Sequence, residues 1–167
     1  ALHARVRKLP AGARPVVVLP SYNGARKLPV LTPLLALMLA RKGLPVLVHG
    51  TATEDARVTT AQVLALAGVQ AQPASERIRE GGLHVVPTEA LHPGLERLLQ
   101  VRRRTGVRSS AHSVVKLMNP VAGAALVVGS YTHTEFAHTM AATLALTGQN
   151  ALLLRGTEGE PVADARR

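Results

Sequence analysis

The alternation of short hydrophobic runs with helix-type segments constrains the fold of this chain more than any other feature. The run PVVVL (15–19) is continuous and rich in valine, which is typical of a strand buried on both faces of a parallel sheet. Further strands are predicted at 45–49, 83–86, 126–128 and 151–154, and helices at 32–42, 59–67, 95–104, 112–118 and 135–146. Such units with short connections favour an α/β fold, with a largely parallel sheet flanked by helices and joined by right-handed crossovers.

Length and composition predict a single folded domain over residues 1–167. The chain has 167 residues, of which 47% are hydrophobic, so it can bury a real core, and disorder is not expected. We expect the chain to be a fragment of a longer protein, because it begins without Met and ends in DARR. The longest apolar stretch, 28–40, is too short to span a bilayer, and we expect a cytoplasmic protein without a membrane partner.

Positive charge is concentrated in two segments. The formal net charge is +10, and residues 1–42 carry eight basic side chains and no acidic one, while residues 95–134 carry six against Glu96 alone. A basic surface of this kind attracts polyanions, although charge that serves only solubility is the simpler alternative. Only three aromatic residues are present, so binding to a nucleic acid would depend on phosphate contacts and on salt rather than on base stacking.

The loop PSYNGARK (20–27) lies between the first predicted strand and a helix that Thr32 and Pro33 begin, as N-cap and first helical residue. Ligands of open α/β sheets bind at the carboxyl ends of strands, where glycine-containing loops and helix N-termini offer N–H groups to anions. A tight turn at Asn23-Gly24 with capping hydroxyls is an equally good interpretation. The candidate phosphate-binding residues of this loop are Ser21, Asn23, Gly24, Arg26 and Lys27.

The segment LERLLQVRRRTGVR (95–108) is a second candidate phosphate-binding patch. Cations at a helix C-terminus stabilise it by roughly 0.3–1 kcal/mol each, which explains part of the pattern. Four arginines within seven residues exceed what capping needs and indicate phosphate contacts. The predicted binding residues are Arg102, Arg103, Arg104 and Arg108, together with Arg41 and Lys42 at the end of the first helix. Arg5, Arg7, Lys8 and Arg14 form a second-rank group that can also be a solvated linker, and Lys116 is a weaker candidate.

No catalytic residue, metal site or cofactor is predicted from the residues themselves. The chain has no cysteine, so neither a disulfide nor a thiolate zinc site can form. His133 and His138 are five positions apart, whereas two ligands on one helix face need a spacing of four.

The order of these segments resembles the α/β domain of the anthranilate phosphoribosyltransferase family. The family's GTGGD loop, KHGNR-type turn, VR-x-x-LG-x-RT segment and LLGPLxNP stretch correspond to PSYNGARK, LVHGT (47–51), VRRRTGVRSS (101–110) and KLMNP (116–120). The resemblance covers nearly the whole chain and implies a nucleoside phosphorylase/phosphoribosyltransferase catalytic-domain fold. It also implies that the family's helical N-terminal domain precedes Ala1 and is absent from this chain.

The chain departs from the family's pattern at three places. PSYNG replaces the glycines that hold pyrophosphate, and Val48 and Ala52 replace the Lys and Arg of the family's turn. The family's magnesium-binding acidic pair falls at Pro161 and Val162, beside Glu158 and Glu160. Phosphoribosyl transfer requires both magnesium and a pyrophosphate clamp, so these departures favour a binding protein over an enzyme.

More specifically, the segments PSYNGARKLP, LTPLLALMLARKG, VVGSYTHTEF and LLLRGTEGEPVAD are similar to the YbiB-type branch of the family. That resemblance implies a homodimer that binds DNA or RNA with little sequence preference, through a basic groove on a degenerate transferase fold. The alternative is an active phosphoribosyltransferase that uses phosphoribosyl pyrophosphate and Mg²⁺, with Arg102 holding an anionic aromatic acceptor. A third hypothesis is a sensor of a phosphorylated metabolite.

Overall fold

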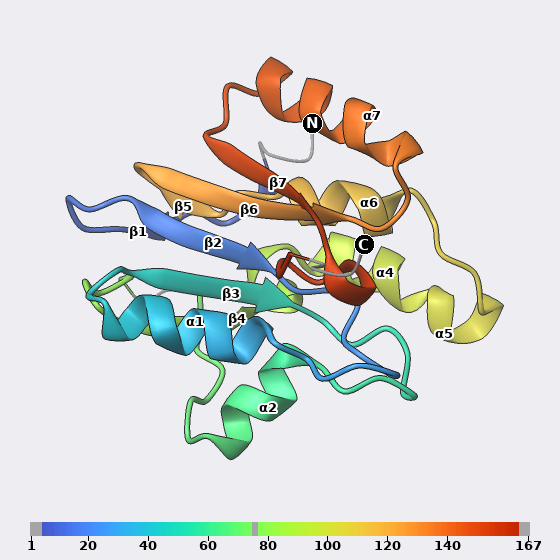
Figure 1. Cartoon of the computed structure of the whole chain (residues 1–167), viewed down its shortest axis with the longest axis horizontal. Helices are drawn as coiled ribbons and strands as arrows, with labels where there is room; N and C mark the ends of the chain where they lie inside the picture. Colours follow the sequence, from blue (N-terminus) through green and yellow to red (C-terminus); the bar gives the residue numbers. More distant parts are fainter. Residues whose placement is uncertain (1–4, 75–76, 164–167) are drawn as a thin grey trace.

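A computed structural model describes residues 5–74 and 77–163 of the chain (Figure 1). Its centre is a five-stranded sheet in the order β4-β3-β2-β6-β7, and all four strand pairs are parallel. The strands are β2 (Val16–Pro20), β3 (Val46–Gly50), β4 (Leu83–Pro87), β6 (Ala125–Tyr131) and β7 (Ala151–Arg155). A separate two-stranded parallel sheet pairs β1 (Leu9–Pro10) with β5 (Val121–Ala122). The predicted α/β fold with a largely parallel sheet is confirmed.

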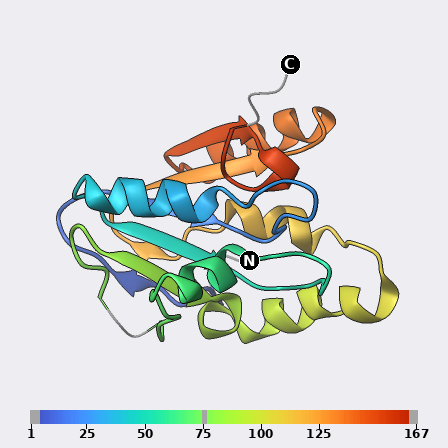
Figure 2. The same ribbon diagram turned by 60° about the horizontal axis from the view of Figure 1, so that its bottom comes forward.

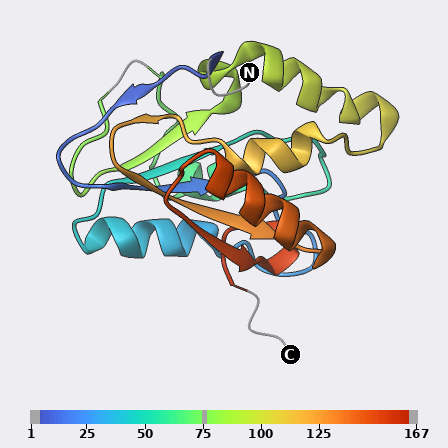
Figure 3. The same ribbon diagram turned by 90° about the horizontal axis from the view of Figure 1, so that it is seen from above.

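Helices cover both faces of the sheet, as the crossovers of a parallel sheet require. Figures 2 and 3 show α1 and α4 on opposite sides of the strands. The α-helices are α1 (Thr32–Arg41), α2 (Thr60–Leu66), α3 (Thr88–Leu91), α4 (Pro93–Gln100), α5 (Arg102–Thr105), α6 (Ala111–Val114) and α7 (Glu135–Leu146). Two 3₁₀ turns are η2 (Val115–Leu117) and η3 (Thr157–Gly159). No helix within residues 5–74 and 77–163 is long and apolar enough to cross a membrane.

The side chains of β2 alternate between two hydrophobic cores. Val16 and Val18 pack into the core beneath α3, α4 and α6, whereas Val17 and Leu19 pack into the core beneath α1 and α2. Successive side chains of a strand point to opposite faces, so the continuous run is buried on both. Each such buried side chain stabilises the fold by about 1.5–3 kcal/mol.

Two predicted helices are shorter in the structure than the sequence indicated. The predicted helix 95–104 is divided into α4 and α5, with Val101 between them, and α4 already begins at Pro93. The predicted helix 112–118 is the short helix α6 continued by the 3₁₀ turn η2. Helix α3 and the small β1–β5 sheet were not predicted, because segments of two to four residues carry too few positions to show a period.

The strand order reverses between β2 and β6. The chain passes from β2 to β3 on one side, and it later returns to place β6 on the other side of β2. A reversal of this kind leaves a crevice at the carboxyl ends of the two strands, where open α/β sheets hold their ligands. The loop that follows Pro20 lies at this position.

Candidate functional site

The loop after β2 is closed around a carboxylate of the chain itself. Ser21, Asn23 and Gly24 are buried, and all three donate hydrogen bonds to the side chain of Glu160, which is only 2% exposed. The backbone N–H groups of Asn23 and Gly24 lie 2.9 and 2.7 Å from Glu160 Oε1, and the Ser21 hydroxyl binds Oε2. The predicted phosphate-binding loop therefore already holds an anion.

Two helix N-termini complete the surroundings of Glu160. The Thr32 hydroxyl, in the first turn of α1, donates to Glu160 Oε2 at 3.2 Å, and the Thr60 hydroxyl of α2 lies 3.4 Å from the same oxygen. The sequence predicted Thr32 as an N-cap, but the capping position is Leu31 and carries no side-chain cap. The Thr32 hydroxyl is used for the carboxylate instead, and the positive ends of the helix dipoles favour this placement.

Glu158, in the 3₁₀ turn η3, is a second carboxylate that binds the loop after β2. Its carboxylate accepts the backbone N–H of Arg26 at 2.9 Å and those of Lys27 and Leu28 at 3.3 Å. Burial acts to raise the pKa of Glu158, but these N–H donors outweigh burial and lower the pKa below its ordinary value. Glu158 also adopts a positive φ of 49°, a conformation that costs energy for a residue other than glycine.

Arginines gather around Glu54, in the loop that follows β3. Arg57 binds Glu54 at 3.0 Å, Arg26 lies 3.9 Å from it, and Arg102 binds it closely while also donating to the Thr53 hydroxyl at 3.2 Å. Burial acts to raise the pKa of Glu54, but the hydrogen bond from Arg57 and the charge of Arg102 lower it overall. One carboxylate is thus shared by three guanidinium groups.

Arg57 also links this cluster to the loop after β2, because its guanidinium donates to the Gly24 carbonyl at 3.3 Å. Arg57 was not among the residues predicted from the sequence to bind phosphate. It is an isolated cation beside two acidic residues, Glu54 and Asp55, and no periodicity or charge run singles it out.

The remaining arginines of the 102–108 segment differ in how firmly they are held. Arg103 pairs with Asp55, and it donates to the Ala52 carbonyl at 3.1 Å and to Gln100 at 2.7 Å. Arg104 and Arg108 make no ion pair within the described part of the chain, and both are exposed residues. Lys27 is likewise exposed and has no carboxylate partner there. We call this group the carboxyl-edge basic surface: Arg26, Lys27, Arg57, Arg102, Arg103, Arg104 and Arg108.

Two other predicted residues, Arg41 and Lys42, lie at the amino ends of the strands, opposite the loop after β2. Arg41 and Lys42 end α1, which runs antiparallel to the strands and so finishes near the amino end of β3. Arg14 is close to them, since it donates to the Gly43 carbonyl at 3.2 Å. The structure therefore does not bring Arg41 and Lys42 together with the loop after β2.

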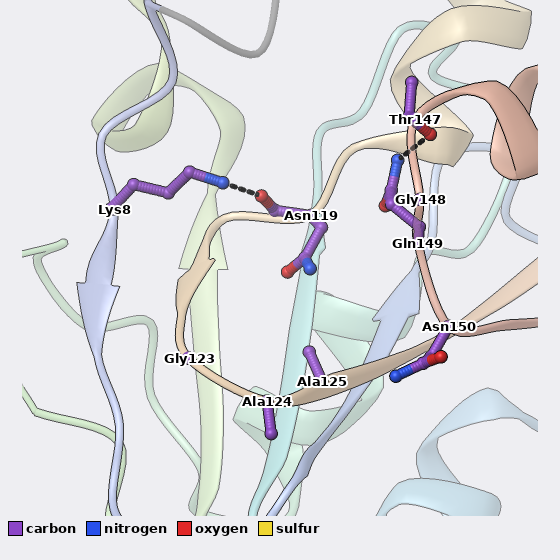
Figure 4. Close-up of a pocket in the computed structure, with 9 residues that line it drawn as sticks. All are labelled: Lys8, Asn119, Gly123, Ala124, Ala125, Thr147, Gly148, Gln149 and Asn150. Carbon is purple, nitrogen blue, oxygen red and sulfur yellow. Dashed lines mark hydrogen bonds between the residues drawn. The ribbon is translucent and has the colours of Figure 1, made fainter.

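Lys8 lies beside a cavity of about 440 Å³ at the amino ends of β6 and β7 (Figure 4). Its ammonium donates to the Asn119 carbonyl at 2.6 Å. Arg5 and Arg7 of the same segment are exposed. Because ligands of open parallel sheets bind at the carboxyl ends, this cavity is on the less favourable edge.

A larger cavity of about 540 Å³ separates α6 and η2 from α7, and Arg108, His112 and Lys116 line part of it. Lys116 is buried beneath the loop, where it donates to the Gly159 carbonyl at 3.0 Å. Burial lowers the pKa of Lys116 to about 8, although the nearby charge of Glu160 acts to raise it. Arg108, a member of the carboxyl-edge basic surface, thus also lines this cavity.

Comparison with known proteins places this arrangement in a family. The chain is 42% identical over 163 residues to the uncharacterized protein YbiB of Escherichia coli K12. The aligned region covers 95% of the chain and 51% of that relative. It is 29% identical over 161 residues to anthranilate phosphoribosyltransferase of Thermus thermophilus. The crystal structure of the enzyme from that organism matches 94% of the chain with a TM-score of 0.71 at 26% identity. The chain belongs to the anthranilate phosphoribosyltransferase-like family.

The likeness extends to more distant structures of the family. Anthranilate phosphoribosyltransferase of Saccharomyces cerevisiae, in complex with PRPP and Mg, shares the fold over 96% of the chain, with a TM-score of 0.61 at 14% identity. The chain spans about half the length of these relatives. No protein-family model matches it.

The acidic residues nearest to the family's magnesium positions do not fit that ion here. The carboxylates of Glu158 and Glu160 point into the loop and accept backbone N–H and hydroxyl donors, which a bound cation would repel. Pro161 and Val162, to which the family resemblance assigns the acidic pair, offer no carboxylate. Among the described residues, no group of three His, Cys, Asp or Glu side chains is placed to hold a metal.

Proposed function

We propose that this protein binds the phosphate backbone of nucleic acids, without sequence preference, at the carboxyl-edge basic surface. The observation that carries this proposal is the arrangement around Glu54, where Arg26, Arg57 and Arg102 share one carboxylate. Lys27, Arg104 and Arg108 lie at the same edge without a carboxylate partner among the described residues. An excess of guanidinium groups on one edge suits a polyanion that presents a phosphate at each step.

The ion pairs of this surface are of the kind that a phosphate can replace. The pair between Arg26 and Glu54 leaves 52% of the arginine side chain exposed, and in the pair between Arg103 and Asp55 the aspartate is 86% exposed. Exposed pairs contribute only about 0–1 kcal/mol, so exchanging the carboxylate for a phosphate costs little. Because the chain has only three aromatic residues, the affinity for nucleic acids would come mainly from phosphate contacts and not from base stacking.

The proposal is tested by titrating fluorescent duplex and single-stranded DNA with the full-length protein, across a salt series and without magnesium. We expect similar affinity for unrelated sequences and a steep loss of binding as salt rises. The double variant Arg104→Ala/Arg108→Ala should weaken binding to all sequences alike, because phosphate contacts carry no sequence information.

The matched control is Arg41→Ala/Lys42→Ala, which removes the same charge at the opposite edge of the sheet. We expect it to change the affinity much less. Equal weakening by the two double variants would place the contact elsewhere, and no binding even at low salt would overturn the proposal.

Phosphoribosyl transfer is the competing function, favoured by the relatives named as anthranilate phosphoribosyltransferases. It is tested by adding phosphoribosyl pyrophosphate, magnesium and anthranilate to the full-length protein. We expect no product, because Glu160 fills the loop where pyrophosphate would have to bind.

A homodimer of the full-length protein, which the family resemblance implies, would present two copies of the basic surface.

A further inference from the structure

Lys116 differs from the other lysines of the chain in its surroundings. Lys8, Lys27 and Lys42 are exposed, whereas Lys116 is only 7% exposed. Its ammonium donates to the Gly159 carbonyl at 3.0 Å, and no ion pair within the described part of the chain includes it. A buried ammonium group has three N–H donors to satisfy, so these surroundings disfavour its charged form.

The cavity between α6, η2 and α7 provides space for a small molecule beside this lysine. Its volume is about 540 Å³, which is within the range of ligand sites, and Lys116 lines it. Leu117, Phe136 and Met140 form an apolar wall of the cavity, and serine and threonine side chains line much of the remainder. Such a lining favours a molecule that has a hydrocarbon body and a single polar group.

Burial makes Lys116 more reactive than an exposed lysine at neutral pH. It lowers the pKa of Lys116 to about 8, while the charge of Glu160 acts to raise the pKa and that of Arg108 acts to lower it. At pH 7 roughly a tenth of Lys116 is therefore a neutral amine, whereas an exposed lysine with a pKa of about 10.4 is neutral in fewer than about one molecule in a thousand. The neutral amine is the nucleophilic form of lysine.

His112 supplies a hydrogen-bond donor to the same region. Its Nδ1 accepts the Ser109 N–H at 3.2 Å, so the neutral ring carries its proton on Nε2. Burial lowers the pKa of His112 and so favours the neutral ring, and Nε2 has no hydrogen-bond partner among the described residues. His112 lines the cavity four positions before Lys116 in a continuous helical segment, a spacing that places two side chains on one face. A carbonyl oxygen bound there would supply the missing acceptor.

We propose that Lys116 is a nucleophilic amine that forms an imine with apolar aldehydes bound in this cavity. The neutral Nζ attacks the carbonyl carbon, the π electrons of the carbonyl move to its oxygen, and that oxygen takes up a proton that Nζ releases. The resulting carbinolamine loses its hydroxyl group as water and leaves a C=N bond to Nζ, so an amine and an aldehyde give an imine and water without oxidation or reduction. His112 Nε2 would donate to the carbonyl oxygen during the attack. The proposal does not rest on nucleic-acid binding, since neither Lys116 nor His112 belongs to the carboxyl-edge basic surface.

The test treats the full-length protein at pH 7 with hexanal and cyanoborohydride, which reduces each imine to a stable secondary amine, and measures the modified peptides by mass spectrometry. We expect Lys116 to be modified at least about tenfold faster than Lys8, Lys27 or Lys42, which serve as exposed controls in the same sample. With acetaldehyde the preference for Lys116 should be smaller, because its chain is too short to contact the apolar wall of the cavity. Lys116 modified no faster than the exposed lysines, or preferred equally by the two aldehydes, would overturn the proposal.

Variants of the cavity wall locate the reaction without changing the lysine itself. Phe136→Ala removes an exposed part of the apolar wall, so it should reduce the preference of hexanal for Lys116 and affect acetaldehyde much less. The matched control is Leu146→Ala, which removes an exposed side chain from the same helix outside the cavity and should change neither rate. His112→Ala should slow the modification of Lys116 by both aldehydes. Equal effects of Phe136→Ala and Leu146→Ala on hexanal would contradict binding in this cavity.

Discussion

Gly50, at the scale of a single residue, is a position where an added side chain would meet backbone rather than the movable end of another side chain. A β-carbon there would lie 1.9 Å from the Ser21 carbonyl oxygen, in a backbone that Ser21 itself holds by donating to the His49 carbonyl at 2.8 Å. We expect Gly50→Ala to lower the free energy of unfolding by about 3–4 kcal/mol, measured by urea denaturation. Gly106→Ala is the control, because nothing lies within 4 Å of its β-carbon and only the φ of +70° opposes it, at about 1–2 kcal/mol. Equal losses in the two variants would contradict the steric argument.

Lys116 should make stability depend on pH in the alkaline range. Burial lowers its pKa to about 8 in the folded protein, from 10.5 in the unfolded chain. Between these values the unfolded chain binds more protons, so the free energy of unfolding should rise with pH from about 8 to 10.5, by an amount on the order of 1–3 kcal/mol. Urea denaturation at several pH values should show this rise for the wild type but not for Lys116→Met. A rise of the same size in both would assign it to other groups.

The second helix, at the scale of an element, depends on a capping box that the sequence TTAQ encodes. The Thr59 hydroxyl accepts the N–H of Gln62 at 3.3 Å, and the Gln62 side chain accepts the N–H of Thr59 at 2.8 Å. We expect Thr59→Ala to lower the free energy of unfolding by about 1 kcal/mol. Thr143→Ala within α7 is the control, because its hydroxyl only donates back to the Thr139 carbonyl and its loss should be neutral or slightly stabilising.

Helix α5 packs on the loop after β3 through Arg102 and Arg103, whereas Arg104 makes no such contact within the described residues. Variants of Arg102 and Arg104 can therefore distinguish an effect on stability from an effect on DNA binding. Arg102, with 12% of its side chain exposed, binds Thr53 and Glu54, so Arg102→Ala should lower the free energy of unfolding by about 1.5–3 kcal/mol. Arg104 makes no ion pair among the described residues, and Arg104→Ala should stay within about 0.5 kcal/mol of the wild type. Thermal melts of both variants beside their DNA affinities would show whether binding is lost without a loss of fold, as we expect for Arg104→Ala.

The whole molecule carries a formal net charge of +10, and its affinity for DNA should depend strongly on salt. The logarithm of the binding constant should fall linearly with the logarithm of salt concentration, with a slope of about −0.9 for each phosphate contact on a duplex. Removing Arg104 and Arg108 together should therefore make the slope less steep, by about 2 in magnitude. Removing Arg41 and Lys42 should leave the slope nearly unchanged. An unchanged slope for the first variant would exclude those arginines as phosphate contacts.

The sequence by itself determined which segments become the five strands of the central sheet and where the loop after β2 would lie. These features follow from local patterns: a continuous run such as 15–19 can be buried only as a central parallel strand, and Thr32-Pro33 and Gly43 limit the following helix. The motifs at 101–110 and 116–120 likewise pointed to the family, because they are short and contiguous. Local sequence patterns of this kind predict an element without any knowledge of the residues that pack against it.

Only the tertiary structure decided what the loop holds and which basic residues share a surface. Asn23 and Glu160 are 137 positions apart, and no periodicity in the sequence indicates that a carboxylate from beyond β7 enters the loop after β2. The sequence likewise grouped Arg41 with Arg26 by charge, but an antiparallel crossover helix carries Arg41 to the far edge of the sheet. Contacts of this kind depend on strand order and crossover direction, which the chain fixes only when its two hydrophobic cores are packed together.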